Sequence, residues 1–418
     1  MLATLPAAPT LGTMSNSDTA RTLKLIEVPT GPAAIDALWS RLDAALAGEL
    51  TIAPIPEESP SLPGPVVAAM RRAVRPDDPV PGHIAVVVST SGSTGNPRGV
   101  MLTASALTST TQQINSRAGG DPTWILAIPP TSIGGLNVMI RAHATGRQPI
   151  AVSSVGGAER FTDEAFAKAV DAATATNRPI AVSLVPTQLP RLLSSAAGRT
   201  ALAECSLILV GGAALAPQAA RDCQAAGIVV TTTYGMTETS GGCVLNGVPL
   251  DGLEIRVDES DQRIWITGPM LAQGYRDGAD AIFDGRWLRT NDRGRWSDGV
   301  LQVIGRLDDI VSIQGVNVDL VAVEDRLNDH PATTAAIAVP VVDDETHDQR
   351  IAMIYVGEAI DRNELRDWIA PILGSIATPS SIHQVDGFIS TVSGKVDRRA
   401  TASQLGLTVD EPDNEELA

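Results

Sequence analysis

The chain has 418 residues, of which 44% are hydrophobic, and carries 48 acidic against 31 basic side chains, for a formal net charge of −17 at pH 7. This length exceeds one compact core and favours two domains. The acidic balance disfavours nucleic acid binding, which needs a basic surface, and no apolar run approaches the roughly 20 residues that span a bilayer.

The first twenty residues are rich in Ala, Pro, Thr and Ser and contain no Lys or Arg, so they lack the charged start of a signal peptide. We expect a cytoplasmic protein with a disordered stretch over residues 1–20, in which either Met1 or Met14 is the start. The 3 cysteines and 5 histidines are scattered, which argues against a disulfide framework and a zinc site. Oligomeric state stays open between a monomer and a homodimer.

A short apolar run over residues 83–88 predicts a buried strand, and a loop rich in glycine and hydroxyl side chains follows it. Glycines let backbone N–H groups approach a ligand closely, and hydroxyls donate to phosphate oxygens. The loop is not a Walker A loop, because Pro-Arg-Gly stands where Gly-Lys-Ser/Thr is needed. The pattern predicts a nucleotide phosphate site formed by Thr90, Ser91, Gly92, Ser93, Thr94, Gly95 and Arg98.

From about residue 84 to 300, short Val/Ile/Leu runs alternate with Ala-rich stretches that are compatible with helices. This alternation predicts a parallel sheet covered on both faces. Ligands of such sheets bind beyond the carboxyl ends of the strands, so we expect the loops there to form one cleft. The predicted strands are 124–128, 180–185, 207–210 and 228–231, and the loops are 129–132, 186–188, 211–214 and 232–239.

The pattern changes to short alternating strands over residues 254–303, which predicts a small β-rich subdomain. A second, α+β domain follows. Asp319 and Asp361 are expected to cap helices, and strands are expected at 334–342 and 351–356. The proposed divisions are a disordered stretch at 1–20, a nucleotide-binding domain at 21–306, a C-terminal domain at 307–408 and an acidic tail at 409–418.

Four further motifs follow the phosphate loop. They are Thr233-Tyr-Gly-Met-Thr-Glu238, Arg289-Thr-Asn-Asp-Arg-Gly294, Gly305-Arg-Leu-Asp-Asp309 with Gly315 and Glu324, and Ser393-Gly-Lys-Val-Asp-Arg398. In this order they resemble the motifs of the adenylate-forming enzymes, which include acyl-CoA synthetases, luciferases and peptide-synthetase adenylation domains. The resemblance implies an α/β fold with a large N-terminal domain of parallel-rich sheets, a small β-rich subdomain and a smaller mobile α+β C-terminal domain.

The resemblance also implies a role for each motif. In this family a carboxylic acid attacks the α-phosphorus of ATP and expels pyrophosphate, so the protein must position anions and neutralise their charge. Lys395 would bridge the acid and the α-phosphate, Thr237 would contact that phosphate, and Glu238 would bind Mg²⁺. Asp308 would be the hinge of the C-terminal domain. The remaining AMP-binding residues would be Gly211, Gly212, Ala213, Thr233, Tyr234 at the adenine, Gly235, Met236, Asp292 at the ribose, and Arg306. Asn291 stands where the family usually has glycine, so a different local turn is expected before Asp292.

Residues 183–189 and 234–252 are similar to o-succinylbenzoate–CoA ligases of menaquinone biosynthesis. This similarity implies that ATP and coenzyme A are co-substrates and that Mg²⁺ is the metal cofactor. The predicted acid-binding wall is polar and small, which suits a flat substrate with extra oxygens. It comprises Ser132, Gly134, Ser183, Thr187, Gln188, Gly241 and Gly242, together with the turn at 211–212. The family usually has histidine at Thr131 or Ser132, and its loss here leaves Arg141, Arg147 and loop N–H groups as candidate partners for a distal carboxylate.

Three alternatives stay open at this point. Another aryl- or medium-chain acyl-CoA synthetase would keep every ATP motif and differ only in the acid pocket. A free-standing adenylation domain would load a carrier protein instead of CoA. A non-catalytic nucleotide-binding relative is disfavoured by the presence of Glu238, Asp292 and Lys395.

Overall fold

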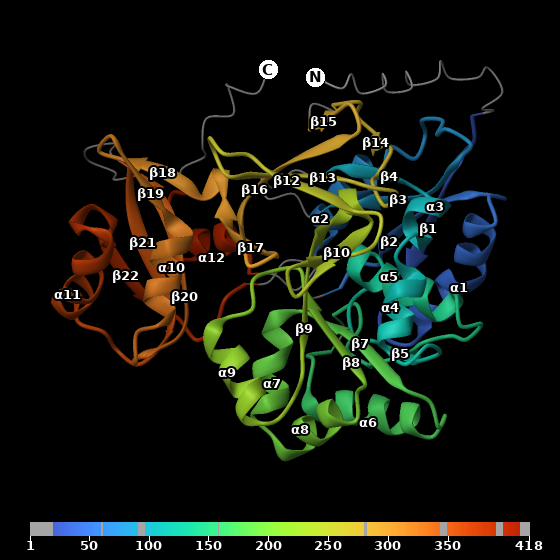
Figure 1. The fold of residues 1–418 in the computed structure, drawn as a ribbon, viewed down its shortest axis with the longest axis horizontal. Coiled ribbons are helices and arrows are strands. Elements are labelled where there is room, and N and C mark those ends of the chain that lie inside the picture. Colours follow the sequence, from blue (N-terminus) through green and yellow to red (C-terminus); the bar gives the residue numbers. More distant parts are fainter. Residues whose placement is uncertain are drawn as a thin grey trace, which may run out of the picture.

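The structure, a computed structural model, describes residues 20–59, 62–90, 97–157, 159–279, 282–342, 349–389 and 396–409. Two sheets with their helices and a β-rich subdomain form the large N-terminal domain. A smaller C-terminal domain, orange to red in Figure 1, lies beside it. Five predicted phosphate-loop residues, from Ser91 to Gly95, and the predicted catalytic Lys395 lie outside the described residues.

The first sheet has the order β1-β2-β3-β4-β14 and carries the start of the phosphate loop. Its strands are β1 (Leu23–Val28), β2 (Thr51–Pro56), β3 (Ile84–Ser89), β4 (Gly99–Thr103) and β14 (Gly274–Tyr275). Helices α1 (Ala33–Leu46) and α2 (Gly64–Ala73) pack against it. Every residue of β3 is buried, as the apolar run predicts. Because β4 pairs with β14, a segment near residue 275 lies beside the end of the phosphate loop.

The second sheet has the order β11-β10-β9-β8-β7-β5-β6. The strands from β6 to β9 run parallel, as predicted, and β10 and β11 add an antiparallel edge. The strands are β5 (Thr123–Leu126), β6 (Ile150–Ala151), β7 (Ile180–Leu184), β8 (Leu207–Gly211), β9 (Thr231–Met236), β10 (Gly241–Leu245) and β11 (Val248–Pro249). The connecting helices are α3 (Ala104–Thr108), α4 (Thr111–Arg117), α5 (Ile133–His143), α6 (Asp163–Thr174), η1 (Pro186–Gln188), α7 (Leu189–Leu193), α8 (Ala196–Ala203), α9 (Pro217–Ala225) and η2 (Thr237–Thr239).

One predicted strand is wrong in its position. The apolar run 228–231 was expected to form it, yet β9 spans Thr231–Met236 and Val229 is 84% exposed. The residues that form β9 are polar, but they pair with β8 on one side and β10 on the other. Threonine and tyrosine favour strands, so local propensity and pairing on both edges together support a strand at this position.

The β-rich subdomain is present as predicted. It contains β12 (Glu254–Val257), β13 (Arg263–Thr267), β15 (Phe283–Asp284), β16 (Trp287–Ser297) and β17 (Val300–Arg306). Asn291 lies within the long strand β16 and is absent from the residues with a positive φ. The different turn expected at this position is therefore wrong, because the chain continues as a strand paired with β13 and β17.

The C-terminal domain has its own apolar core and a three-stranded sheet, β20-β21-β22. Asp319 and Asp361 cap its first two α-helices, as predicted, by accepting hydrogen bonds from backbone N–H groups. Its elements are η3 (Leu307–Asp309), β18 (Ile310–Ile313), β19 (Val316–Asp319), α10 (Leu320–Asn328), β20 (Thr333–Val342), β21 (Gln349–Gly357), α11 (Arg362–Leu373), η4 (Ser375–Ala377), β22 (Ser381–Gln384) and α12 (Arg398–Gln404). Among the described residues, no helix is long and apolar enough to cross a membrane.

Candidate active site

Several predicted site residues lie on neighbouring strands, at the carboxyl ends of the parallel sheet. Ser183 on β7 lies opposite Leu126 on β5, and Gly211 at the end of β8 lies opposite Thr233 on β9. The contact there is close, since a Cβ on Gly211 would lie 2.1 Å from Thr233 Oγ1. Only glycine fits at this position, which lets the 211–214 loop begin directly against β9.

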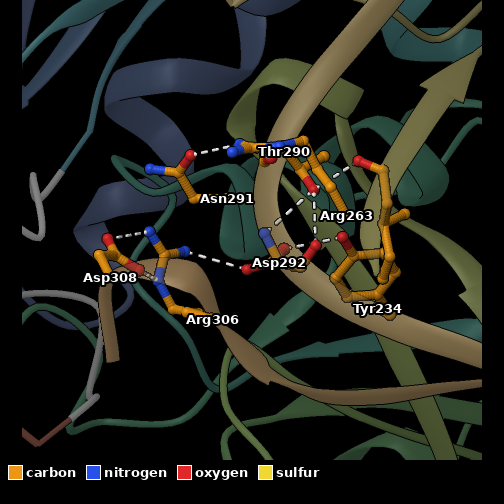
Figure 2. Close-up of polar contacts among 8 residues, drawn as sticks. Tyr234, Arg263, Thr290, Asn291, Asp292, Arg306 and Asp308 are labelled. Carbon is orange, nitrogen blue, oxygen red and sulfur yellow. Dashed lines mark hydrogen bonds and ion pairs between the residues drawn. The ribbon is translucent and has the colours of Figure 1, made fainter. Parts of the chain in front are cut away.

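Asp292 is the centre of a polar cluster that joins three of the predicted motifs (Figure 2). Tyr234 Oη donates to Asp292 Oδ2 at 2.7 Å, and Arg306 Nη1 donates to Oδ1 at 3.0 Å. The Asp292 backbone N–H donates to Thr290 Oγ1 at 3.1 Å, and Asp292 is only 7% exposed. Burial, and then the charge of Asp292, raise the pKa of Tyr234, so its phenol stays protonated and remains a donor.

Arg306 connects this cluster to the predicted hinge. Its guanidinium binds both oxygens of Asp308, with Nε to Oδ1 and Nη2 to Oδ2 each at 2.7 Å (Figure 2). Burial lowers the pKa of Arg306, but the hydrogen bond to Asp308 and the charges of nearby carboxylates outweigh burial and raise it overall. Arg306 is therefore a permanent cation held between Asp292 and Asp308.

Arg98, the predicted phosphate-binding cation, belongs to a second cluster. Its Nε and Nη2 donate to Asp277 Oδ2 and Oδ1 at 2.9 and 2.7 Å, and its guanidinium lies 3.4 Å from the centroid of the Tyr275 ring. Tyr275 Oη in turn donates to Glu238 Oε1 at 2.6 Å. The sequence analysis missed both Tyr275 and Asp277. They lie far from residue 98 in the chain, and only the pairing of β14 with β4 brings them there.

Two residues predicted to bind the acid form side-chain hydrogen bonds to the protein backbone. Gln188 Nε2 donates to the Ala127 carbonyl at 3.0 Å, and its Oε1 accepts from Val185 N at 2.9 Å. Ser132 caps α5, and its Oγ donates to the Pro129 carbonyl at 2.8 Å. These side chains hold the loops after β5 and β7 in place. The second N–H of the Gln188 amide and the lone pairs of the Ser132 hydroxyl give both side chains further hydrogen-bonding capacity, so their predicted contact with the acid stays a prediction.

The glycine turn at Gly241 depends on a residue that the sequence analysis missed. Asn137 Nδ2 donates to the Ser240 carbonyl at 2.7 Å, and a Cβ on Gly241 would lie 2.1 Å from that same nitrogen. Gly241 also has a φ of +98°, in the region that favours glycine. The turn is thus fixed from α5, although nothing near residue 137 in the sequence signals this role.

Arg141 and Arg147 are excluded as partners of a distal carboxylate. Arg147 Nη1 pairs with Asp121 Oδ1 at 2.8 Å, and Asp121 precedes β5. The Arg141 guanidinium lies 5.4 Å from the ring of Trp124, which is the second residue of β5. Both arginines therefore lie near the amino end of β5, whereas the predicted acid site lies beyond its carboxyl end.

Replacing Arg141 with methionine is expected to stabilise the protein. Arg141 is 4% exposed, burial lowers its pKa to about 10, and its guanidinium forms no hydrogen bond or ion pair with the residues that the structure describes. Apolar replacement of buried ionic groups can raise the free energy of unfolding by about 1–4 kcal/mol. Urea denaturation of Arg141→Met measures this. Arg147→Met, at an exposed ion pair, is the control and should change little. A less stable Arg141→Met would show that the contact with Trp124 dominates.

Comparisons with known proteins show the family of this chain. The AMP-binding enzyme family matches residues 18–276, and the AMP-binding enzyme C-terminal domain matches residues 322–395. A probable 2-succinylbenzoate–CoA ligase of Mycobacterium tuberculosis is 36% identical over 399 residues, which cover 93% of this chain and 100% of that protein. The 2-succinylbenzoate–CoA ligase of Salmonella typhimurium is 30% identical over 77% of this chain and 69% of its own length.

Two solved structures share the fold. An amide bond synthetase from Marinactinospora thermotolerans aligns with a TM-score of 0.74 at 22% identity, over 92% of this chain and 90% of its own. The o-succinylbenzoate CoA synthetase of Bacillus subtilis, in complex with its acyl-adenylate intermediate, aligns with a TM-score of 0.67 at 21% identity, over 90% and 87% of the two chains. The sequence matches, the fold and the joined motifs lead to one conclusion: the chain belongs to the AMP-binding family of adenylate-forming enzymes.

Proposed function

We propose that this enzyme is an ATP-dependent acid–CoA ligase of menaquinone biosynthesis. It converts o-succinylbenzoate, ATP and CoA into o-succinylbenzoyl-CoA, AMP and diphosphate through an acyl-adenylate. The observation that carries the proposal is the 36% identity to the mycobacterial ligase over 93% of this chain. The cluster around Asp292 supports it, because residues from three separate motifs meet there.

The nucleotide is proposed to bind across the carboxyl ends of β8 and β9. Each carboxylate oxygen of Asp292 accepts one hydrogen bond, from Tyr234 or from Arg306. A carboxylate oxygen can accept more than one, so Asp292 can still accept the ribose hydroxyls. Arg306 holds that carboxylate in place. The surrounding AMP-binding residues remain those predicted from sequence, namely Gly211, Gly212, Ala213, Thr233, Tyr234, Gly235 and Met236, with Thr237 at the α-phosphate.

Glu238 is proposed to bind the Mg²⁺ of ATP, together with phosphate oxygens and water. No group of three or more His, Cys, Asp or Glu side chains that could hold a metal occurs among the described residues. This fits Mg²⁺, which is usually held by one or two carboxylates plus substrate phosphates. When bound, the ion would neutralise phosphate charge. Arg98 would add a second positive charge at the same end of the site.

The acid is proposed to lie beyond β5 and β7, near Gly134, Ser183, Thr187 and the glycine pair 241–242.

In the first half-reaction, the acid carboxylate attacks the α-phosphorus and diphosphate leaves, while Lys395 holds the two anions together. In the second, the CoA thiolate attacks the acyl carbonyl and AMP leaves. The reactants are small molecules, and the net charge of −17 disfavours a nucleic acid partner. We propose a cytoplasmic enzyme, and light scattering would distinguish a monomer from a homodimer.

Pyrophosphate release across a panel of acids, with and without CoA, tests the substrate. We expect o-succinylbenzoate to give the highest kcat/KM, and o-succinylbenzoyl-CoA to form only when CoA is present. A higher kcat/KM for benzoate or octanoate would contradict the substrate assignment. Acyl transfer to a carrier protein but not to CoA would favour an adenylation domain, and no release with any acid would favour a non-catalytic relative.

A further inference from the structure

Tyr275 lies at the end of the phosphate loop although it is far from that loop in the sequence. It belongs to the two-residue strand β14, where it pairs with Val100 of β4, and Gly99 directly follows Arg98. Tyr275 is 6% exposed, so its side chain is fixed by its surroundings. The sheet therefore places this tyrosine between the loop and the strand end that carries Glu238.

Two opposite charges contact different parts of this one side chain. The Arg98 guanidinium lies over the ring face, 3.4 Å from the centroid, and Glu238 Oε1 accepts a hydrogen bond from the phenol oxygen at 2.6 Å. Asp277 binds Arg98 through both of its oxygens, and the Ala279 carbonyl accepts from Arg98 Nη2 at 2.7 Å. Arg98 is thus held on the ring by several groups other than Glu238.

This arrangement places the Tyr275 side chain in contact with both members of an oppositely charged pair. Arg98 and Glu238 interact electrostatically, and a direct contact would engage the carboxylate with a guanidinium fork, which is a strong hydrogen-bonding partner. With Tyr275 in place, a neutral hydroxyl donates to Glu238 Oε1. That bond fixes the orientation of the carboxylate and leaves its remaining lone pairs for a cation.

We propose that Tyr275 is a positioning residue that keeps Arg98 apart from Glu238 and orients the Glu238 carboxylate toward the Mg²⁺ of bound ATP. The inference rests on the proposed function, in which Glu238 is the magnesium ligand. Tyr275 itself touches neither the metal nor the acid in this proposal. Its effect should therefore appear in the coupling between metal and nucleotide.

The test measures how much Mg²⁺ tightens ATP binding, by calorimetry with Mg²⁺ and with EDTA, in the absence of any acid. The chain has 3 tyrosines, so the same Tyr→Phe change can be made at each. The quantity compared is the factor by which Mg²⁺ lowers the Kd for ATP. Tyr275→Phe should reduce this factor about tenfold, as expected for one lost charge-assisted hydrogen bond. The Kd for ATP without metal should stay unchanged.

The other two tyrosines are matched controls. Tyr234→Phe loses a similar hydrogen bond to Asp292, so it should weaken ATP binding equally with and without Mg²⁺. Tyr355 lies in the core of the C-terminal domain, where its hydroxyl accepts from Ile360 N, so Tyr355→Phe should change neither value.

A double-mutant cycle decides whether Tyr275 acts through Glu238. Glu238→Gln alone should remove most of the tightening by Mg²⁺, and adding Tyr275→Phe should then have no further effect. Full tightening in Tyr275→Phe, or an equal loss of ATP affinity with and without Mg²⁺, would overturn the proposal, and so would additive losses in the double variant. No acid is present, so an error in the o-succinylbenzoate assignment cannot produce any of these results.

Discussion

Lys395→Ala is expected to slow acyl-adenylate formation by about 10²–10³-fold, the usual effect of removing one group that stabilises charge in the transition state. Transfer of the acyl group from supplied o-succinylbenzoyl-adenylate to CoA should stay nearly unchanged, because the proposed role of the lysine is confined to the first half-reaction. Pyrophosphate release measures the first step, and thioester formation from the synthetic adenylate measures the second.

The structure provides a way to separate this effect from unfolding. Residues on either side of the segment that carries Lys395 are held together, since Asp397 N donates to the Ile389 carbonyl at 2.7 Å. Arg398 also binds Glu324 on α10 through two hydrogen bonds, at 2.9 and 2.7 Å. An alanine at position 395 should leave these contacts and the melting temperature unchanged. Equal losses in both half-reactions would show that the role is misassigned or that the domain is disrupted.

Asp308→Pro is expected to lower thioester formation about a hundredfold relative to Asp308→Ala, while both variants form the adenylate at similar rates. The proposed second pose of the C-terminal domain requires φ/ψ changes at the hinge, and proline fixes φ near about −65° and restricts Leu307 before it. Asp308 lies in the short helix η3, and helices of this kind have φ of about −50 to −70°, so proline suits the φ expected at position 308 in the pose seen here. A competent pose reduced to roughly 1% of molecules would give this loss.

The alanine variant is an informative control because of Arg306. Both substitutions remove the carboxylate that binds the Arg306 guanidinium, so both should affect the nucleotide site equally. Only the proline variant also restricts the backbone. If the proline and alanine variants lose thioester formation to the same extent, the loss of charge explains the effect and the hinge assignment is wrong.

An ion pair joins the two domains close to the predicted hinge. Arg293 on β16 forms an ion pair with Asp319 at 2.7 Å, and Asp319 is the residue that caps α10. One carboxylate thus joins the β-rich subdomain to the first helix of the C-terminal domain. The cap could be predicted from sequence, because it depends on neighbouring residues. The ion pair could not, because it depends on how the domains meet.

The sequence by itself determined the features that depend on local patterns or on short motifs. Continuous apolar runs marked the parallel strands, aspartates marked the helix starts at 320 and 362, and the ordered motifs identified the family. These features are encoded by residues close together in the chain, where strand propensity, capping and glycine turns act directly. The sequence also predicted that Tyr234, Asp292 and Arg306 belong to one nucleotide site, through resemblance rather than through contacts.

Only the tertiary structure decided which groups meet across long separations. It moved β9 onto polar residues through pairing at both edges, and it placed Arg141 beside Trp124, away from the predicted acid site. It also brought Tyr275 between Arg98 and Glu238. A side chain's partners depend on sheet order and on which strands pair, and a single sequence contains no local signal for either.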